Sequence, residues 1–237
     1  MSSETDSIIE YRIRQIFLMI TFLVATPLNV YVFVKLLRVW HSRHGNQATI
    51  MLKLHLNVSD LFVCWLFVLP RVLWSFTYEF HGGALLCKSV MFGMVLSFVL
   101  SSSIIAAYAV YVLTAVLCPF TPVAQHLSRV RLLIAFAWLY SVLLSAPQLL
   151  TWDVIEIDSP PIGRQRHCAS AFMVADYHER MNASTWVSAT MQTVQHVYTY
   201  VHLTGTFALP FAMVTVCYAV VMVQICVAKS ANPSVYT

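Results

Sequence analysis

Five long stretches of apolar residues run through the chain, and polar segments separate them. A helix needs about 20 mostly apolar residues to cross the ~30 Å hydrocarbon core of a bilayer. Each stretch is about this long or longer and is apolar on every side, whereas a barrel strand would alternate apolar and polar positions. We therefore expect an all-α membrane protein, a multi-pass helical bundle that forms one domain over 1–237. The predicted spans are 14–37, 54–78, 86–118, 131–152 and 196–228, with a long outer loop over 153–195.

The composition supports a membrane protein and excludes several other classes. Hydrophobic residues make up 59% of the chain and charged residues 10%, whereas a soluble domain carries about 25% charged residues. The net charge is +4 and no Lys/Arg run is present, so we expect no nucleic-acid partner. The chain has no glycine-rich phosphate loop and no Ser/His/Asp set at a shared depth, which predicts no enzyme and no cofactor. His41 and His44 lack further ligands nearby, so we predict no firm metal site.

The distribution of charge suggests an orientation in the membrane. Lysines and arginines divide equally between the two sides, so the positive-inside rule does not decide. One side, however, has short loops without acidic residues, and the other carries the long loop 153–195. Long loops are translocated largely regardless of their charge. We therefore expect the N-terminus and this loop outside the cell and the C-terminus inside.

Asp60 is the one carboxylate inside a predicted span. A charge at this depth costs about 2.5–3.5 kcal/mol on insertion scales, so it should face the bundle interior and meet polar groups. The expected partners are Asn29 in the first span and Ser101 in the third. Two interpretations stay open: a hydrogen-bonded cluster that holds helices together, or a cation site of the sodium type that biases the bundle between two states.

Motifs along the spans resemble those of rhodopsin-class G-protein-coupled receptors. The residues that carry the resemblance, over about 15–228, are Asn29, the stretch 54–61 (LHLNVSDL), 85–88 (LLCK), Trp138 with 145–148 (SAPQ), and Pro210 with Tyr218. Within that class, 68–74 (VLPRVLW) and 80–87 (FHGGALLC) look most like the vasopressin/oxytocin and gonadotropin-releasing-hormone receptor group. The resemblance implies a seven-helix receptor fold, of which this chain holds five helices, at the plasma membrane.

The same resemblance implies a ligand, partners and site residues. The ligand would be a small peptide hormone or neuropeptide, and the partners a heterotrimeric G protein and a second receptor in a dimer. Cys87 and Cys168 would form a disulfide on the outer side. Asn182, in a glycosylation sequon, would carry a glycan. The residues at pocket-facing depths are Gln148, Arg71, Phe67, Met91 and Met94.

Two departures from the family pattern bear on signalling. At the inner end of the third helix, Tyr111, Val112 and Leu113 stand where the family has Asp-Arg-Tyr, so the arginine that contacts the G protein is absent. No apolar stretch for a sixth or seventh helix is present either. We therefore expect a peptide receptor that is signalling-incompetent because it is truncated. The alternative is a non-signalling membrane protein that associates with full-length receptors. A small transporter is disfavoured because just one buried charge and no repeat are present.

Overall fold

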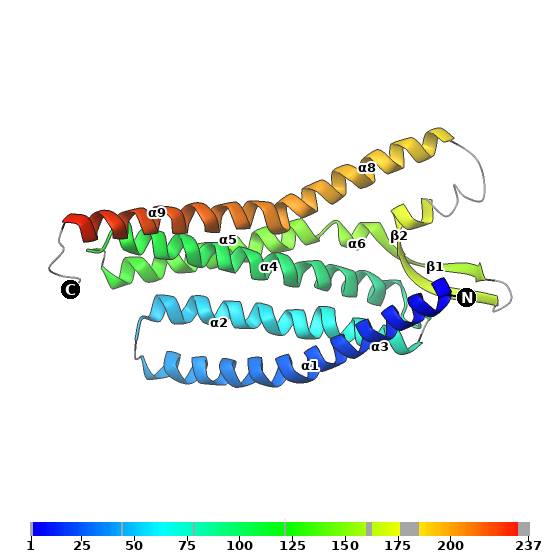
Figure 1. Ribbon diagram of the computed structural model, residues 1–237, viewed down its shortest axis with the longest axis horizontal. Helices are drawn as coiled ribbons and strands as arrows, with labels where there is room; N and C mark the ends of the chain where they lie inside the picture. The colour runs from blue at the N-terminus through cyan, green and yellow to red at the C-terminus, as the bar shows by residue number, and fades with distance from the viewer. Residues whose placement is uncertain are drawn as a thin grey trace.

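The computed structural model describes residues 2–43, 45–77, 79–120, 122–159, 163–175 and 185–231. Long helices lie side by side along one axis, with the start of α1 and a β-hairpin at one end and the last turns of α9 at the other (Figure 1). The elements are α1 (Ser2–Ser42), α2 (Gln47–Phe62), the π-helical turn η1 (Val63–Val68), α3 (Leu69–Thr77), α4 (Ala84–Leu117), α5 (Val123–Ser145), α6 (Gln148–Thr151), β1 (Trp152–Ser159), β2 (Gly163–Ser170), α8 (Thr185–Leu203), the π-helical turn η2 (Thr204–Ala208) and α9 (Leu209–Ala231).

The expected multi-pass helical bundle is confirmed. In the described part of the chain, five helices are long and apolar enough to cross a membrane: Ile9–Ser42, Gln47–Thr77, Ala84–Leu117, Gln125–Thr151 and Thr190–Ala231. The second joins α2, η1 and α3, and the fifth joins α8, η2 and α9. The first and last helices extend beyond the predicted spans at both ends, because their flanking polar residues continue the helix outside the apolar core.

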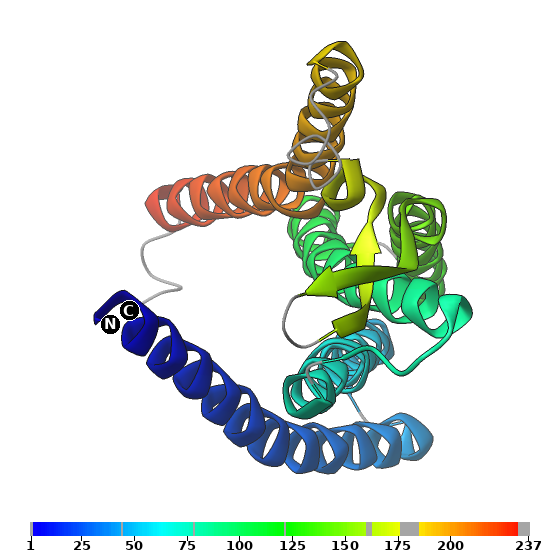
Figure 2. The same cartoon turned by 90° about the vertical axis from the view of Figure 1, so that its right-hand side faces the viewer.

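The third span, α4, forms the centre of the bundle. The end-on view shows it surrounded by α2, α5 and α9, with α1 on the outside against α2 (Figure 2). Leu100, Ile104 and Ala107 of α4 pack in one buried cluster with residues of α2 and α5. By contrast, the apolar side chains of α1 mostly face outward. Such exposure suits a lipid-facing helix, because lipid tails are as apolar as these side chains.

Two prolines each follow a π-helical turn. A proline inside a helix has no N–H to donate, so one carbonyl of the preceding turn loses its partner. Before Pro70 the Leu69 N–H bonds to Cys64 O, and before Pro210 the Leu209 N–H bonds to Thr204 O; both are bonds to the fifth residue back. The next carbonyl in that register, Gly205 O, accepts a hydrogen bond from Tyr140 Oη of α5 at 2.9 Å. A neighbouring helix thus satisfies the carbonyl that the proline leaves free.

The segment after α6, which the sequence predicts as part of a long loop, forms regular structure. β1 and β2 make an antiparallel hairpin in which Trp152 pairs with Ser170 and Val154 with Cys168. Gly163 begins the return strand at a φ of +94°, a conformation that favours glycine. Residues 152–158 (WDVIEID) alternate apolar and acidic side chains in part, which is the pattern of a half-buried strand.

Candidate ligand-binding site

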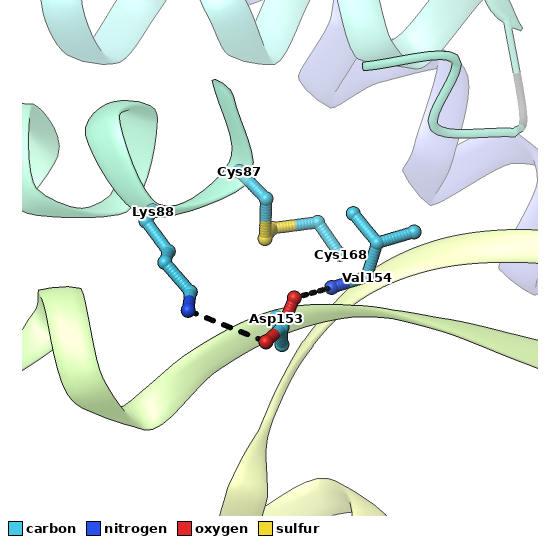
Figure 3. Close-up of polar contacts among 5 residues, drawn as sticks. All are labelled: Cys87, Lys88, Asp153, Val154 and Cys168. Atoms are coloured by element: carbon cyan, nitrogen blue, oxygen red, sulfur yellow. Dashed lines mark hydrogen bonds and ion pairs between the residues drawn. A yellow bond between two sulfur atoms is a disulfide. The ribbon is translucent and has the colours of Figure 1, made fainter. Parts of the chain in front are cut away.

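A disulfide holds the hairpin against the end of the bundle where α1 begins, which the expected orientation makes the outer end. It joins Cys87, in the first turn of α4, to Cys168 on β2, with the Cα atoms 5.6 Å apart and a sequence separation of 81 (Figure 3). Both cysteines lie in a buried cluster with Phe80, Met91 and Met94. The Phe80 N–H also donates to Arg166 O of β2 at 2.8 Å. The pairing that the family resemblance implied is therefore present in the structure.

An ion pair makes a second connection between α4 and the hairpin. Lys88 Nζ lies 3.3 Å from Asp153 Oδ2, and the Val154 N–H donates to Asp153 Oδ1 at 2.8 Å (Figure 3). The hydrogen bond from the Val154 amide and the one from Lys88 lower the pKa of Asp153 below its ordinary value. Because the Asp153 side chain is more than half exposed, solvent screens this pair and its contribution is small.

Two cavities lie at this outer end, and Arg71 and Trp74 of α3 line both. The first has a volume of about 510 Å³ and lies between the outer part of α1 and α3. The second has a volume of about 600 Å³ and lies between α3, α4 and the hairpin. Residues of the second are mostly aromatic or aliphatic: Trp74, Met91, Trp152, Ile155, Ile157 and Met173. Their size and apolar lining suit a small ligand or the end of a peptide.

The structure brings some of the predicted pocket residues together and separates others. Arg71 lines both cavities, Phe67 the first and Met91 the second. Gln148 and Met94 are buried and belong to neither lining. The Gln148 side chain instead accepts a hydrogen bond from Trp152 Nε1 at 2.6 Å and donates to Tyr198 Oη. Gln148 thus connects α6, β1 and α8. Its side-chain oxygen and its side-chain nitrogen each make a hydrogen bond within the protein.

The polar residues at mid-membrane depth pair differently from the expected trio. Asn29 Oδ1 accepts from Asn57 Nδ2 at 3.0 Å. No hydrogen bond between described residues joins Asp60 to Asn29 or to Ser101. Asn57 lies one helical turn before Asp60 on α2. The packing of α1 places Asn29 beside the side-chain amide of Asn57. Described residues form no group of three or more metal-ligating side chains. The sodium-type site at Asp60 therefore stays a prediction.

At the opposite end, which the expected orientation makes the inner end, Tyr111 is buried and hydrogen-bonded. Its hydroxyl accepts from Asn46 Nδ2 at 2.8 Å and from Thr49 Oγ1 at 3.5 Å. Asn46 also caps α2, since its Oδ1 accepts from the amides of Ala48 and Thr49. The Tyr111 side chain, at the position where the resemblance puts the family's acidic residue, thus fixes Asn46 and the start of α2 to α4. Val112 and Leu113 are half-buried and carry no charge.

Several polar contacts join helices between residues that the sequence does not pair. Trp138 Nε1 donates to His55 Nδ1 at 3.2 Å, which joins α5 to α2. The Asn46–Tyr111 and Gln148–Tyr198 bonds likewise connect separate helices. A polar side chain inside an apolar span is a signal of such pairing, but it does not identify the partner. The predicted glycan site Asn182 lies outside the described residues.

Comparisons with known proteins show which family this chain is similar to. The family model described as 7 transmembrane receptor (rhodopsin family) matches residues 28–235. The human vasopressin V1b receptor is 30% identical over 173 residues, 73% of this chain and 36% of that receptor. Cephalotocin receptor 1 of Octopus vulgaris is 35% identical over 101 residues, 43% of this chain and 25% of that receptor. G-protein coupled receptor daf-38 of Caenorhabditis elegans is 34% identical over 140 residues, 57% of this chain and 32% of that receptor.

These matches span between a quarter and just over a third of each relative. The relatives are receptors and not enzymes, which agrees with the sequence-based expectation. The helical bundle, the tethered outer hairpin and the match over most of the chain lead to one conclusion: the chain belongs to the rhodopsin family of seven-transmembrane receptors.

Proposed function

We propose that this chain binds a small peptide hormone or neuropeptide at the plasma membrane, with its N-terminus outside and its C-terminus inside. One observation carries the proposal: the disulfide-tethered hairpin covers an apolar cavity of about 600 Å³ at the end of the bundle where α1 begins. Relatives named as vasopressin and cephalotocin receptors support a peptide as the ligand. A cavity of this size takes part of a peptide, and the hairpin offers further contacts around it.

Binding of labelled vasopressin-type peptides to the chain in lipid nanodiscs tests this function. Trp74 lines both outer cavities, whereas Trp65 is exposed on the lipid-facing side and lines neither. Truncating a buried aromatic anchor commonly costs 2 kcal/mol or more, about 30-fold in affinity. We expect Trp74→Ala to weaken binding by about this factor and Trp65→Ala to leave it unchanged. Equal effects of the two substitutions would argue against the site, and no binding of any peptide would argue against the function.

We further propose that the chain couples weakly or not at all to a G protein. The support is at the inner end, where Tyr111 is a buried, neutral hydrogen-bond acceptor and Val112 replaces the family's arginine. A purified G protein reports coupling through peptide-stimulated nucleotide exchange. We expect no stimulation by this chain, under conditions in which a full-length vasopressin receptor responds. A clear peptide-dependent response would contradict the proposal.

A second candidate function is association with full-length receptors without signalling. The observation that favours it is the continuous exposed apolar surface of α9, which includes Phe211, Val216 and Met222. Lipid covers such a surface equally well, so association needs a direct test. Resonance energy transfer between this chain and a co-expressed vasopressin receptor would detect the pair, and a single-span membrane protein at equal density would be the control. Saturable transfer above that control is expected if the second function is correct.

The orientation has its own test at Asn182. If the loop 153–195 lies outside, the sequon at Asn182 is accessible to the glycosylation machinery. We expect a glycosidase-sensitive mass on the wild-type chain and its loss in Asn182→Gln. A C-terminal epitope that antibodies reach only after permeabilisation provides the matching evidence for the inner side. The reverse accessibility would contradict the orientation.

A further inference from the structure

Two arginines at the outer end lack acidic partners within the described residues. Arg71 of α3 and Arg14 of α1 line the cavity of about 510 Å³, and no carboxylate is found among the described residues of its wall. The ion pairs found between described residues involve other cations, namely Lys88, Arg164 and Arg166. The guanidinium of Arg71 lies over the Phe67 ring, 5.8 Å from its centroid. Among the described residues, the positive charge in this cavity therefore has no acidic counter-charge.

Arg71 also reaches the second cavity, and the described residues of its wall again include no acidic side chain. The other side chains around that cavity are mostly aromatic and aliphatic, with Trp74 and Trp152 as the largest. An arginine remains protonated in proteins. Arg71 is exposed, so an anion from outside can reach its guanidinium, and the positive charge of Arg14 on the first cavity adds to the attraction. The guanidinium presents parallel N–H donors that match the two oxygens of a carboxylate.

We propose that this site selects an anionic ligand, in which a carboxylate binds Arg71 and an adjoining aromatic or aliphatic group occupies the cavity under the hairpin. In a peptide, such a carboxylate would belong to an acidic side chain or to a free C-terminus. The proposal rests on the function proposed above, because it concerns the ligand of the same site. It adds the charge of that ligand, which neither the family nor the names of the relatives specify.

A pair of shape-matched probes tests the charge directly. Indole-3-acetate and indole-3-acetamide share one ring system and differ in a carboxylate against a neutral amide. Saturation-transfer NMR with the chain in phosphatidylcholine nanodiscs, corrected for empty nanodiscs, gives the affinity of each probe. We expect the carboxylate to bind about tenfold more tightly, because its two oxygens accept both parallel N–H donors of Arg71 and its negative charge attracts the guanidinium, whereas the amide offers one oxygen and no charge.

Substitutions at Arg71 assign this preference to the residue. Arg71→Gln removes the charge, and we expect the two probes to bind equally. Arg71→Lys keeps the charge without the paired donors, and part of the preference should remain, which separates a charge effect from a folding defect. Arg129→Gln is the matched control, since Arg129 is an exposed arginine of α5 outside both cavities.

The anion could also be the phosphate of a lipid headgroup. A further experiment with an anionic lipid distinguishes this source from a ligand in solution. Phosphatidylglycerol added to the nanodiscs should leave the preference unchanged if the site takes a ligand from outside. Loss of the preference on this addition would assign Arg71 to the membrane and overturn the proposal. Equal binding of the two probes by the wild-type chain, no binding of either, or a preference that survives Arg71→Gln would also overturn it. Peptide binding that persists in those cases would leave the proposed function standing.

Discussion

Removal of the Cys87–Cys168 disulfide should release the hairpin while the helices stay in the membrane. In the chain-entropy treatment, a cross-link that closes a loop of 81 residues stabilises the folded state by about 4.5 kcal/mol. This value assumes that the whole loop becomes flexible on unfolding. Here α5 lies within the loop and remains helical in lipid, so the flexible part is the segment of about 15 residues between α6 and Cys168. A loop of that length gives about 3 kcal/mol.

Hydrogen exchange of the chain in nanodiscs measures this quantity at the hairpin. Amides of β1 and β2 exchange when the hairpin opens, and a loss of about 3 kcal/mol corresponds to roughly a hundredfold faster exchange. We expect this acceleration in the double variant Cys87→Ser with Cys168→Ser. Amides of α2, which packs away from the hairpin, should keep their rates. The exposed free cysteine Cys118 provides the control, since Cys118→Ser should change neither region.

Two outcomes would refute this reasoning. Unchanged exchange in β1 and β2 would mean that the ladder, the Phe80–Arg166 hydrogen bond and the Lys88–Asp153 pair hold the hairpin without the disulfide. Equal acceleration in the hairpin and in α2 would mean that the bundle itself unfolds, so that the whole loop of 81 residues is the relevant length.

Three further changes have defined outcomes. Tyr111→Phe removes the acceptor for Asn46 and should destabilise the inner loop by about 1 kcal/mol, seen as faster exchange at the start of α2 without a change in β2. Gly205→Ala places a Cβ within 2.8 Å of both Leu144 Cδ2 and Tyr140 Oη, and this crowding should lower thermal stability by about 1–3 kcal/mol; an unchanged melting temperature would contradict the close packing of η2 on α5. The pKa of Asp153 is lowered in the folded protein, so its contacts with Lys88 and the Val154 amide are kept above about pH 4. They are lost as the pH falls through the lowered pKa. The Val154 amide shift should titrate with a midpoint below about 3.9, and Asp153→Asn should abolish the titration.

The five spans could be predicted because length and apolar content alone decide whether a helix can cross a bilayer. The hairpin was missed because its two strands lie in a polar segment between spans, where loop and strand patterns overlap. The pairing of Cys87 with Cys168 followed from the family resemblance and not from spacing. The ends of α1 and α8 could not be predicted, since hydropathy does not report helix that continues into water.

The side-chain contacts of the site depend on how each helix is rotated about its axis and packed on its neighbours, which the sequence does not give. Asn57 and Asp60 lie one turn apart on the same face of α2, and which of them meets Asn29 depends on how α1 packs. Gln148 was predicted to face a ligand, but the position of α8 brings Tyr198 within hydrogen-bonding distance of it. Arg71 was predicted as a pocket residue, and it lines both outer cavities.

The π-helical turn before Pro70 determines which way the outer part of the second span faces. Such a turn holds one residue more than an α-helical turn, so every later side chain is rotated by about 100° about the helix axis. A helical wheel drawn continuously from Gln47 would therefore assign Arg71 and Trp74 to the wrong side. Deleting one residue within Val63–Val68 should reverse that offset and turn both side chains away from their present cavities. The direction in which the Arg71 side chain points thus depends on the one extra residue in the π-helical turn Val63–Val68.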